Sequence, residues 1–408
     1  MTIRTLMLAA CLTAAAKAGL TVGDFRARRD ALREMLPPGG VAVVAGATEA
    51  ERGDLRFGFL QDADFYYLTG WREPGALALV GHGIDVLFLP ERNEIRERYT
   101  GRKLSAADAE APKVTGFALV ANAAEFADFV KKQEGDIYAI TPAAGALGDA
   151  LTGRAVQGLA PKLARLRAIK SQVEIDLIQR SVDATVEAHK AAWRRIRPGL
   201  AEYQIAATIA GGYMEHGCER SAYPPIVASG PNSVILHYNA NRRRMDSGEM
   251  LLMDVGAECA GYAADITRTV PVNGRFTRRQ REVYDIVLAA QKAAIAAARP
   301  GMMLTGEGDK SLHRIVKDYL AKFGLDKYYL HGLGHHVGLD VHDRADMSAP
   351  LEAGMVITIE PGVYIAEENL GIRIEDMILI TTDGARVLSA ALPKESAAIE
   401  RALRRRRQ

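Results

Sequence analysis

The sequence predicts a two-domain protein of the α/β (α+β) class whose second domain contains an internal pseudo-twofold repeat. Three observations lead to this prediction. The 408 residues suffice for two domains, each with a sizeable core. Helix and strand patterns alternate along the first half of the chain. In the second half, a set of motifs recurs roughly 105 residues after its first occurrence.

The composition is that of an ordinary soluble globular protein. Charged residues make up 25% and hydrophobic residues 48% of the chain. The formal net charge of +2 gives no reason to expect a nucleic-acid partner. Beyond the N-terminal segment, no apolar run reaches the roughly 20 residues that a membrane span needs. We therefore expect no membrane span.

The N-terminus has the pattern of a secretory signal peptide. Arg4 precedes an apolar run over residues 6–16, and residues 16–18 offer small side chains at the two positions that a signal peptidase reads. We expect residues 1–18 to be removed and the protein to be exported, to a periplasm or outside the cell. The alternative is an ordinary N-terminal helix of a cytoplasmic protein.

The cysteines argue against a thiolate metal site. The chain has three cysteines, and no two of them form a CxxC pair. Cys11 lies in the expected signal peptide, so export would leave Cys218 and Cys259 alone in the mature chain. The sequence leaves open whether these two residues pair.

The first domain is predicted from its local patterns. Residues 24–36 have helical character and end at Pro37-Pro38, and residues 41–46 and 76–90 are typical of strands. Ser171 and Glu174 then have the spacing of a capping box at the start of a new helix. We place the boundary near residue 170, with an N-terminal α/β domain over 19–165 and a second domain over 170–408.

The second domain repeats its own pattern. Arg197-Pro198-Gly199 recurs as Arg299-Pro300-Gly301, with a helical pattern before and after each copy. Each copy continues with a histidine, an apolar strand that ends in an acid, and a second acid, and these are His237, Asp254 and Asp265, then His342, Glu360 and Glu375. The pattern predicts two similar half-domains that face each other and supply one shared cleft.

The four acids predict a dinuclear metal site. A single acid at the end of an apolar strand more often meets water, but four acids at equivalent positions of a repeat would cluster. Clustered carboxylates repel one another and take up protons, and two divalent cations would cancel their charge. Four carboxylates and one imidazole, without a thiolate, favour Mn²⁺, with Co²⁺, Zn²⁺ and Fe²⁺ as alternatives.

The stretch "HGLGHHVGLDVHD", residues 331–343, holds four of the nine histidines of the chain. A solvated loop would explain it without function. Histidine is, however, the commonest metal ligand and a proton carrier near neutral pH. Its partners elsewhere in the chain decide between these interpretations.

Five segments of the second domain resemble the pita-bread metallopeptidases, and most closely the Xaa-Pro aminopeptidases, also called aminopeptidase P. They are "ILHYNAN", "LLMDVGAECAGYAADITRTVPVNGRFTRRQREVYDIV", "HGLGHHVGLDVHD", "GMVITIEPGVYI" and "GIRIEDMILIT". "DFYYLTGWREPGA" extends the resemblance into the first domain. The resemblance implies a creatinase/prolidase-type α/β domain followed by a pita-bread catalytic domain.

The resemblance also implies the roles of particular residues. The metal ligands would be Asp254, Asp265, His335, Glu360 and Glu375. Asp265 and Glu375 would bridge the two ions. Glu360 would also move a proton, and the catalytic histidines would position the substrate and stabilise the charged intermediate; they are His237, His331 and His342. Arg373 shares a strand face with Glu375 and, like Tyr223, is expected to support the ligands.

The expected activity is hydrolysis of the N-terminal Xaa-Pro peptide bond by a metal-activated hydroxide, on peptides with proline at the second position. A prolidase, which cleaves only Xaa-Pro dipeptides, is the alternative. The large N-terminal domain disfavours a methionine aminopeptidase, and the intact carboxylate set disfavours creatinase. A non-catalytic pita-bread binding protein would have lost the ligands. Relatives of this kind imply a homodimer or a homotetramer.

Overall fold

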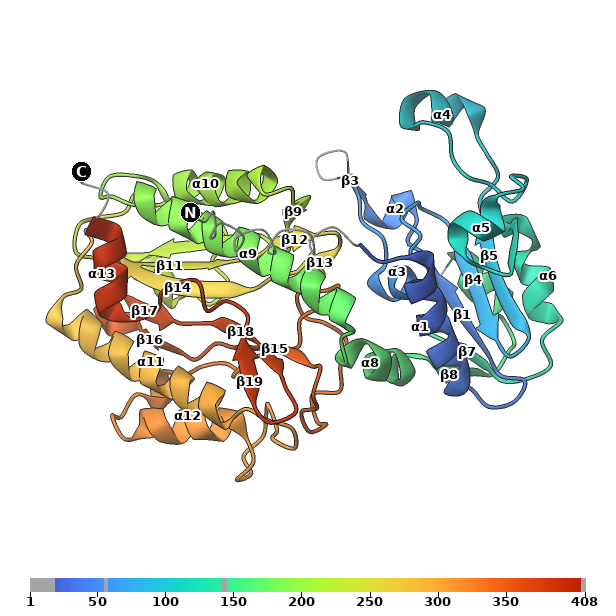
Figure 1. The fold of residues 1–408 in the computed structure, drawn as a ribbon. Helices are drawn as coiled ribbons and strands as arrows, with labels where there is room; N and C mark the ends of the chain where they lie inside the picture. The colour runs from blue at the N-terminus through green and yellow to red at the C-terminus, as the bar shows by residue number, and fades with distance from the viewer. Residues whose placement is uncertain (1–18, 55–57, 141–144, 405–408) are drawn as a thin grey trace, which may run out of the picture. The chain divides into compact units, whose positions relative to one another are not determined.

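The computed structural model describes residues 19–54, 58–140 and 145–404, and these form two compact units (Figure 1). The first unit ends at Leu166 and the second begins at Arg167. The expected signal peptide, residues 1–18 with Cys11, lies outside the described residues. The two-domain α/β prediction is confirmed by an N-terminal α/β domain and a two-repeat domain.

The first unit is built on a six-stranded mixed sheet with the order β6-β5-β4-β1-β7-β8. Its strands are β1 (Val41–Ala45), β4 (Leu77–Gly81), β5 (Ile84–Leu89), β6 (Leu119–Asn122), β7 (Ile137–Ala139) and β8 (Val156–Gly158), with a small pair of β2 (Gly53–Asp54) and β3 (Gly58–Phe59). The strand predictions for 41–46 and 76–90 are confirmed, and the second stretch is an antiparallel hairpin of β4 and β5. Val43, Leu79 and Phe88 form its core.

Short helices complete the first unit. They are α1 (Val22–Glu34), α2 (Glu49–Arg52), α3 (Ala63–Thr69), α4 (Glu94–Thr100), α5 (Ala111–Thr115), α6 (Phe126–Lys131) and α7 (Gly145–Ala150), with a 3-10 turn η1 (Ala123–Glu125). The next helix, α8 (Ala160–Ala168), spans the boundary between the two units. The prediction of a helix at residues 24–36 is confirmed by α1, which begins at a Thr21 and Asp24 capping box and ends before Pro37.

The second unit opens with α9 (Gln172–Arg195), which begins where the sequence predicts. Ser171 accepts a hydrogen bond from the Glu174 N–H at 3.4 Å, and Glu174 accepts one from the Ser171 N–H at 3.0 Å. This pair satisfies donors that the first helical turn cannot satisfy itself, so the capping-box prediction is confirmed. Ile178 and Val182 lie on the apolar face of α9 and are buried.

Two helix pairs mark the repeat of the second unit. The first pair is α9 with α10 (Glu202–Glu215), and the second is α11 (Arg278–Ala297) with α12 (Leu312–Ala321). Gly199 and Gly301 occupy the same place in the two connections, with φ of 86° and 85°, which is a left-handed conformation that favours glycine. The recurring Arg-Pro-Gly motif therefore marks the same turn in both repeats.

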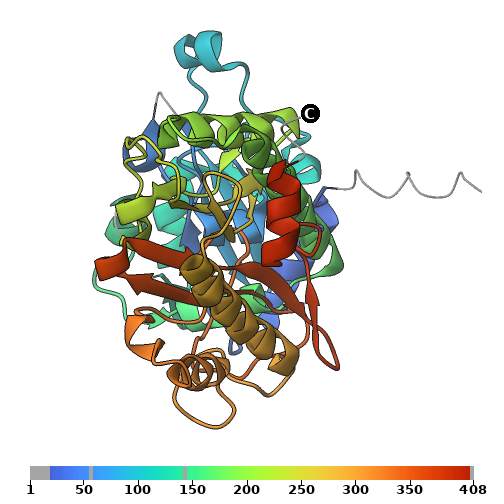
Figure 2. The same ribbon diagram turned by 90° about the vertical axis from the view of Figure 1, so that its left-hand side faces the viewer.

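Small antiparallel sheets lie between these helix pairs (Figures 1 and 2). The first repeat supplies β9 (Arg220–Ser221), β10 (Ile226–Ser229), β11 (Met250–Val255), β12 (Ala257–Cys259), β13 (Tyr262–Ala263) and β14 (Ile266–Pro271). The second supplies β15 (Val356–Ile359), β16 (Gly362–Ile365), β17 (Leu370–Arg373), β18 (Asp376–Ile380) and β19 (Ala385–Val387). α9 and α10 contact strands of the first repeat, and α11 contacts β15, β16 and β17.

Further elements are the 3-10 turns η2 (Gly230–Val234), η3 (Asp326–Tyr328) and η4 (Ala366–Glu368), and the helix α13 (Ser396–Arg404). Cys218 and Cys259 form a disulfide that joins the segment before β9 to the end of β12. This answers the question that the sequence left open.

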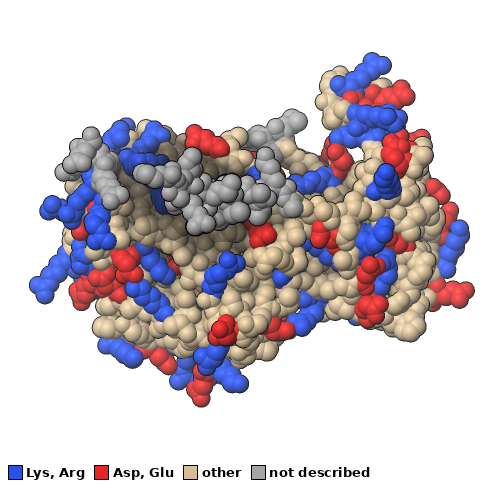
Figure 3. All heavy atoms as spheres, viewed as in Figure 1, with Lys and Arg blue, Asp and Glu red and all other residues tan. Residues whose placement is uncertain are grey.

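The surface and the helices carry two further findings. On the face in Figure 3, basic and acidic side chains are interspersed, in keeping with the small net charge. Among the helices that the structure describes, none combines the length and apolar character needed to cross a membrane.

Candidate metal centre

A cleft of about 490 Å³ in the second unit brings together every residue that the sequence singles out for function. Its lining includes the five predicted ligands, the three predicted catalytic histidines, Arg373 and Tyr223. The remaining wall is mostly apolar and comes from Pro224, Ile226, Leu236, Val341, Asn239, Gly332 and Gly334.

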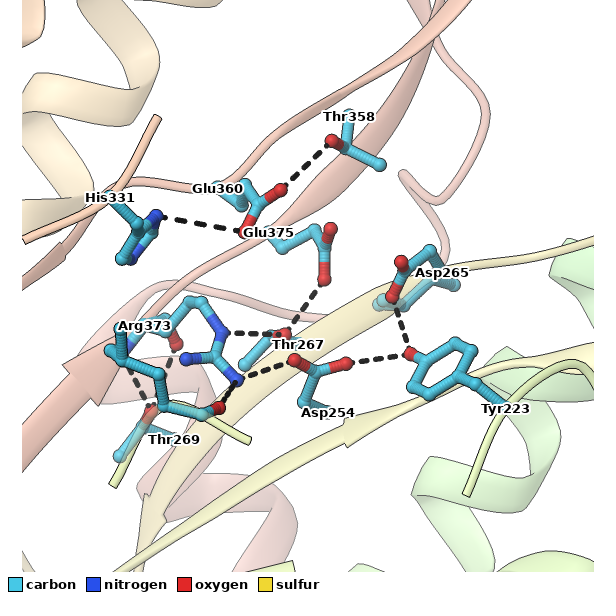
Figure 4. Close-up of polar contacts among 12 residues, drawn as sticks. Tyr223, Asp254, Asp265, Thr267, Thr269, His331, Thr358, Glu360, Arg373 and Glu375 are labelled. Atoms are coloured by element: carbon cyan, nitrogen blue, oxygen red, sulfur yellow. Dashed lines mark hydrogen bonds and ion pairs between the residues drawn. The ribbon is translucent and has the colours of Figure 1, made fainter. Parts of the chain in front are cut away.

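The acids reach this cleft from two pairs of antiparallel strands. Asp254 lies in β11 opposite Thr267 of β14, and Asp265 directly precedes β14. Glu360 directly follows β15, and Glu375 lies between β17 and β18. The acids of both repeats therefore gather between the two pairs (Figure 4).

His335 is fixed in the tautomer that a metal ligand needs. A carbonyl oxygen only accepts, so the Nδ1–H of His335 must donate to the His336 carbonyl, at 3.1 Å. Nε2 then points at the predicted acids and lies 3.4 Å from Asp265 Oδ2 and 3.5 Å from Glu360 Oε1. The main chain of His335 is held on both sides by Thr358, at 3.0 and 2.9 Å. An imidazole held through Nδ1–H by a main-chain carbonyl, with Nε2 directed at carboxylates, is typical of metal sites.

Asp265, His335 and Glu375 form the centre of the candidate site. Each offers one ligand atom, and these atoms all lie within 4.8 Å of one another. Asp254 and Glu360 border this group on opposite sides. The structure thus brings the five predicted ligands together, with the two acids predicted to bridge the ions at the centre.

Asp254 is the one acid of the cleft that the protein itself neutralises. Its side chain forms an ion pair with Arg373 and accepts a hydrogen bond from the Tyr223 hydroxyl at 2.6 Å. Burial opposes its ionisation, but Arg373 and Tyr223 hold the pKa of Asp254 below its usual value. The Tyr223 hydroxyl is also within hydrogen-bonding distance of Asp265, so two predicted ligands share its single proton.

The other three acids carry charge that the protein does not balance. Burial and the neighbouring Asp254 raise the pKa of Asp265 well above its usual value. Burial and Asp265 do the same to the pKa of Glu375. Burial and Glu375 raise the pKa of Glu360 to about 8.

Cations would relieve this repulsion. Among the cleft residues that the structure describes, Arg373 is the only lysine or arginine. Two buried and two partly buried carboxylates against one guanidinium, with an imidazole beside them, fit two divalent cations.

His331 is held as a neutral imidazole. Its Nδ1–H donates to the Gly332 carbonyl at 2.8 Å, so Nε2 accepts from the Tyr364 hydroxyl at 2.8 Å. Tyr364 in turn accepts from Arg373 at 2.7 Å. Burial and Arg373 lower the pKa of His331 to about 4. A chain of contacts therefore runs from Asp254 through Arg373 and Tyr364 to His331.

The other two predicted histidines are both exposed at the cleft. The ring of His342 packs edge-on against His335, with 4.1 Å between centroids, and burial together with His335 lowers the pKa of His342. His237 is exposed on the segment between η2 and β11. Both line the cleft.

Sequence reasoning missed three residues of the site. The Thr267 hydroxyl donates to Glu375 at 2.7 Å, and the Thr358 hydroxyl donates to Glu360 at 3.2 Å. Each threonine lies two residues from an acid, Asp265 or Glu360, and strand alternation would have placed it on the same face. No local signal pointed to Tyr364, the third missed residue.

The two-repeat fold and this carboxylate-rich cleft define a class of protein, the metal-dependent hydrolases. Comparisons with known proteins identify the family within this class. Residues 176–382 match metallopeptidase family M24, and residues 25–138 match the aminopeptidase P N-terminal domain.

Individual relatives agree. The Xaa-Pro aminopeptidase of Haemophilus influenzae is 36% identical over 416 residues, which cover 92% of this chain and 96% of the relative. The structure of Escherichia coli aminopeptidase P with the inhibitor Pro-Leu has a TM-score of 0.87 and 32% identity, and covers 96% of this chain and 100% of that one. A zinc-substituted form of that enzyme with product gives the same values. The chain therefore belongs to the Xaa-Pro aminopeptidases of metallopeptidase family M24, as the sequence motifs predict.

Proposed function

We propose that this chain removes the residue before proline from the N-terminus of peptides, with two divalent cations held by Asp254, Asp265, His335, Glu360 and Glu375. The observation that carries the proposal is the convergence of Asp265, His335 and Glu375, whose ligand atoms lie within 4.8 Å of one another. The orientation of His335 Nε2 and the excess of buried carboxylates support it.

We propose Mn²⁺ as the native metal. An oxygen-rich donor set with one imidazole and no thiolate suits this ion. The zinc-substituted form of the Escherichia coli enzyme concerns that protein and leaves the native metal of this chain to experiment. When bound, the two cations supply Lewis acidity and lower the pKa of a water molecule, which then serves as the nucleophile.

Glu360 has the geometry of a proton carrier. Its Oε1 accepts from Thr358 and lies 3.5 Å from His335 Nε2, whereas its Oε2 lies 3.9 Å from His331 Nδ1. One oxygen thus faces a neighbouring ligand and the other faces a residue that lines the cleft. Glu360 would take a proton from the attacking water as the scissile carbonyl is attacked. It would then pass this proton to the proline nitrogen, which leaves poorly unless it is protonated.

The histidines would position the peptide. His237 and His342 line the cleft and can donate to the oxygen of the attacked carbonyl as negative charge develops on it. Both nitrogens of His331 are engaged with protein groups, so we assign it the placement of the substrate beside Glu360.

The apolar wall of the cleft suits a proline ring. Apolar surface for the ring comes from Pro224, Ile226, Leu236 and Val341.

The test of the proposed activity is an assay after chelation and return of Mn²⁺, with Xaa-Pro-Yaa, Xaa-Ala-Yaa and the dipeptide Xaa-Pro. We expect cleavage of the first alone. Cleavage of the dipeptide alone would identify a prolidase, and equal rates on both tripeptides would reject the proline specificity.

We also propose that the protein is exported after removal of residues 1–18. The N-terminal pattern of Arg4 and the following apolar run motivates this. The Cys218–Cys259 disulfide supports it, because disulfides persist mainly in oxidising compartments. N-terminal sequencing of protein from its own host should begin at Gly19, and an intact N-terminus in a cytosolic fraction would contradict export.

The homodimer or homotetramer implied by relatives is a further proposal, and analytical ultracentrifugation can test it.

A further inference from the structure

We propose that Glu202 is a positioning residue for the reaction, because it fixes the segment that carries His237 in the cleft. This segment, Ile235–Arg243, is called the His237 loop below. The inference rests on the proposed function, since it assigns to Glu202 an effect that reaches the substrate through His237.

Glu202 is a fully buried carboxylate at the start of α10. Its Oε1 accepts from the N–H and the hydroxyl of Ser229, at 2.8 and 2.7 Å, and from the Asn232 amide at 3.0 Å. Its Oε2 accepts from the Tyr238 hydroxyl at 2.8 Å and from the Arg243 N–H at 2.9 Å. Two of these five donors, Tyr238 and Arg243, belong to the His237 loop.

These donors are neutral groups, which is unusual for so deeply buried a carboxylate. A buried charge is costly unless it is fully hydrogen-bonded, and charge-assisted hydrogen bonds are about twice as strong as neutral ones. Glu202 therefore holds its donors more firmly than a neutral acceptor would. It joins the start of α10 to three consecutive segments of the chain: the end of β10, η2 and the His237 loop.

Contacts of two residues inside the loop, Tyr238 and Asn241, hold it in place. The Tyr238 hydroxyl accepts from the Arg242 N–H at 3.2 Å, and the residue packs against a buried cluster of Ile226, Ala228, Leu252 and Tyr364. Asn241 accepts from the Val227 N–H at 2.9 Å and adopts a φ of 51°, a conformation that fixes the direction of the chain.

His237 itself has no such fastening. Its side chain is exposed at the cleft, and it forms no hydrogen bond with any residue that the structure describes. The position of the imidazole is therefore set by its backbone. The neighbouring Tyr238 links that backbone to the buried charge of Glu202.

A double-mutant cycle tests whether Glu202 acts through His237. Tyr238→Phe leaves the ring in place and removes the hydroxyl, which donates to Glu202 and accepts from the Arg242 N–H. We expect kcat/KM for a Xaa-Pro-Yaa peptide to fall about tenfold, because small misplacements of a positioning group are costly. In the His237→Ala background, the same change should cost less than about twofold, since coupled residues are not additive. The two metals per chain should be retained in every variant.

Glu202→Gln gives an independent test. Its amide would direct NH₂ at the Ser229 N–H in one orientation and at the Arg243 N–H in the other, so one donor faces another donor either way. We expect a larger loss than for Tyr238→Phe, again suppressed by His237→Ala. Tyr238→Phe decides the matter alone if Glu202→Gln does not fold.

Tyr284→Phe is the matched control. It removes the hydrogen bond that a buried tyrosine donates to the Lys394 carbonyl at 2.8 Å, on the opposite repeat. It should lower Tm without coupling to His237→Ala. Equal losses from Tyr238→Phe in both backgrounds would overturn the inference while the proposed function stands. No loss from His237→Ala would overturn both the inference and the role proposed for His237 in the reaction. An inactive parent enzyme would overturn both.

Discussion

Glu375 and Asp376 are adjacent buried acids with opposite electrostatic surroundings. Asp376 accepts from Arg268 at 2.7 Å and Ser389 at 2.6 Å through one oxygen, and from Lys394 at 2.6 Å through the other. Although burial opposes its ionisation, Arg268 and Lys394 hold its pKa below the usual value. Glu375 accepts from the neutral Thr267 hydroxyl, and its pKa is raised.

The comparison teaches how to separate a structural acid from a ligand. Strand alternation sends the two side chains to opposite faces. On one face the protein supplies the cations, and the acid stabilises the fold. On the other face the protein leaves the negative charge uncompensated, and a metal ion fits there. Burial alone does not distinguish them, since both are almost fully buried.

The largest expected effect comes from a substitution among the acids whose charge the protein does not balance, Asp265, Glu360 and Glu375. Asp265→Asn removes a charge from the centre of the site, so elemental analysis should find well under two metals per chain. Activity should fall by more than the roughly 10²-fold typical of residues that only support a ligand. The metal-free variant should unfold no more easily than the metal-free parent, because the substitution relieves repulsion. Two tightly held ions with normal turnover would remove Asp265 from the bridging position.

Glu360→Gln sharpens the comparison by separating metal binding from proton transfer. The amide keeps the shape of the side chain and one oxygen that can bind a metal, but it cannot take up and release a proton. We expect kcat to fall by roughly 10²–10⁴, with KM little changed and at least one metal still bound. If excess Mn²⁺ restores the rate, Glu360 is a ligand only, and the proton-transfer role is wrong.

Asp376→Asn removes the charge of the acid that the protein does balance. The substitution leaves Arg268 and Lys394 without their shared carboxylate, and removing one partner of a buried ion pair costs about 3–5 kcal/mol. The free energy of unfolding should fall by that amount in a denaturant titration. The folded fraction should keep its metals and its kcat. Lost metal with unchanged stability would place Asp376 in the site instead.

The smallest expected effect concerns acid stability and uses a second compensated acid, Asp343. Lys170 at 3.0 Å and Arg167 hold its pKa below the usual value although burial opposes this. An acid whose pKa is depressed in the folded state stabilises the fold above its unfolded pKa, and this stabilisation is lost as pH falls through the folded pKa.

The check is a comparison of thermal unfolding between the parent and Asp343→Asn. Their difference in stability should be constant from neutral pH down to about pH 4, the unfolded value for aspartate, and should shrink below it. A difference that stays constant below pH 4 would contradict the role of the carboxylate charge.

The sequence by itself determined much of the fold and the identity of the site. Helix and strand periods are local, so α1, α9 and the β4–β5 hairpin followed from residue patterns. The Arg-Pro-Gly motif identified the repeat because a left-handed turn favours glycine at both positions. Repeat-equivalent acids then pointed to one shared cleft.

The tertiary structure alone decided which acids are compensated and how each histidine is oriented. The Arg373–Asp254 ion pair joins residues 119 apart, and the Thr267–Glu375 hydrogen bond joins residues 108 apart. The disulfide and the Glu202 contacts with the His237 loop likewise join distant segments. Local propensity carries no information on such pairs, because the electrostatic energy of a buried group depends on what lies within a few ångströms of it, wherever that residue stands in the chain.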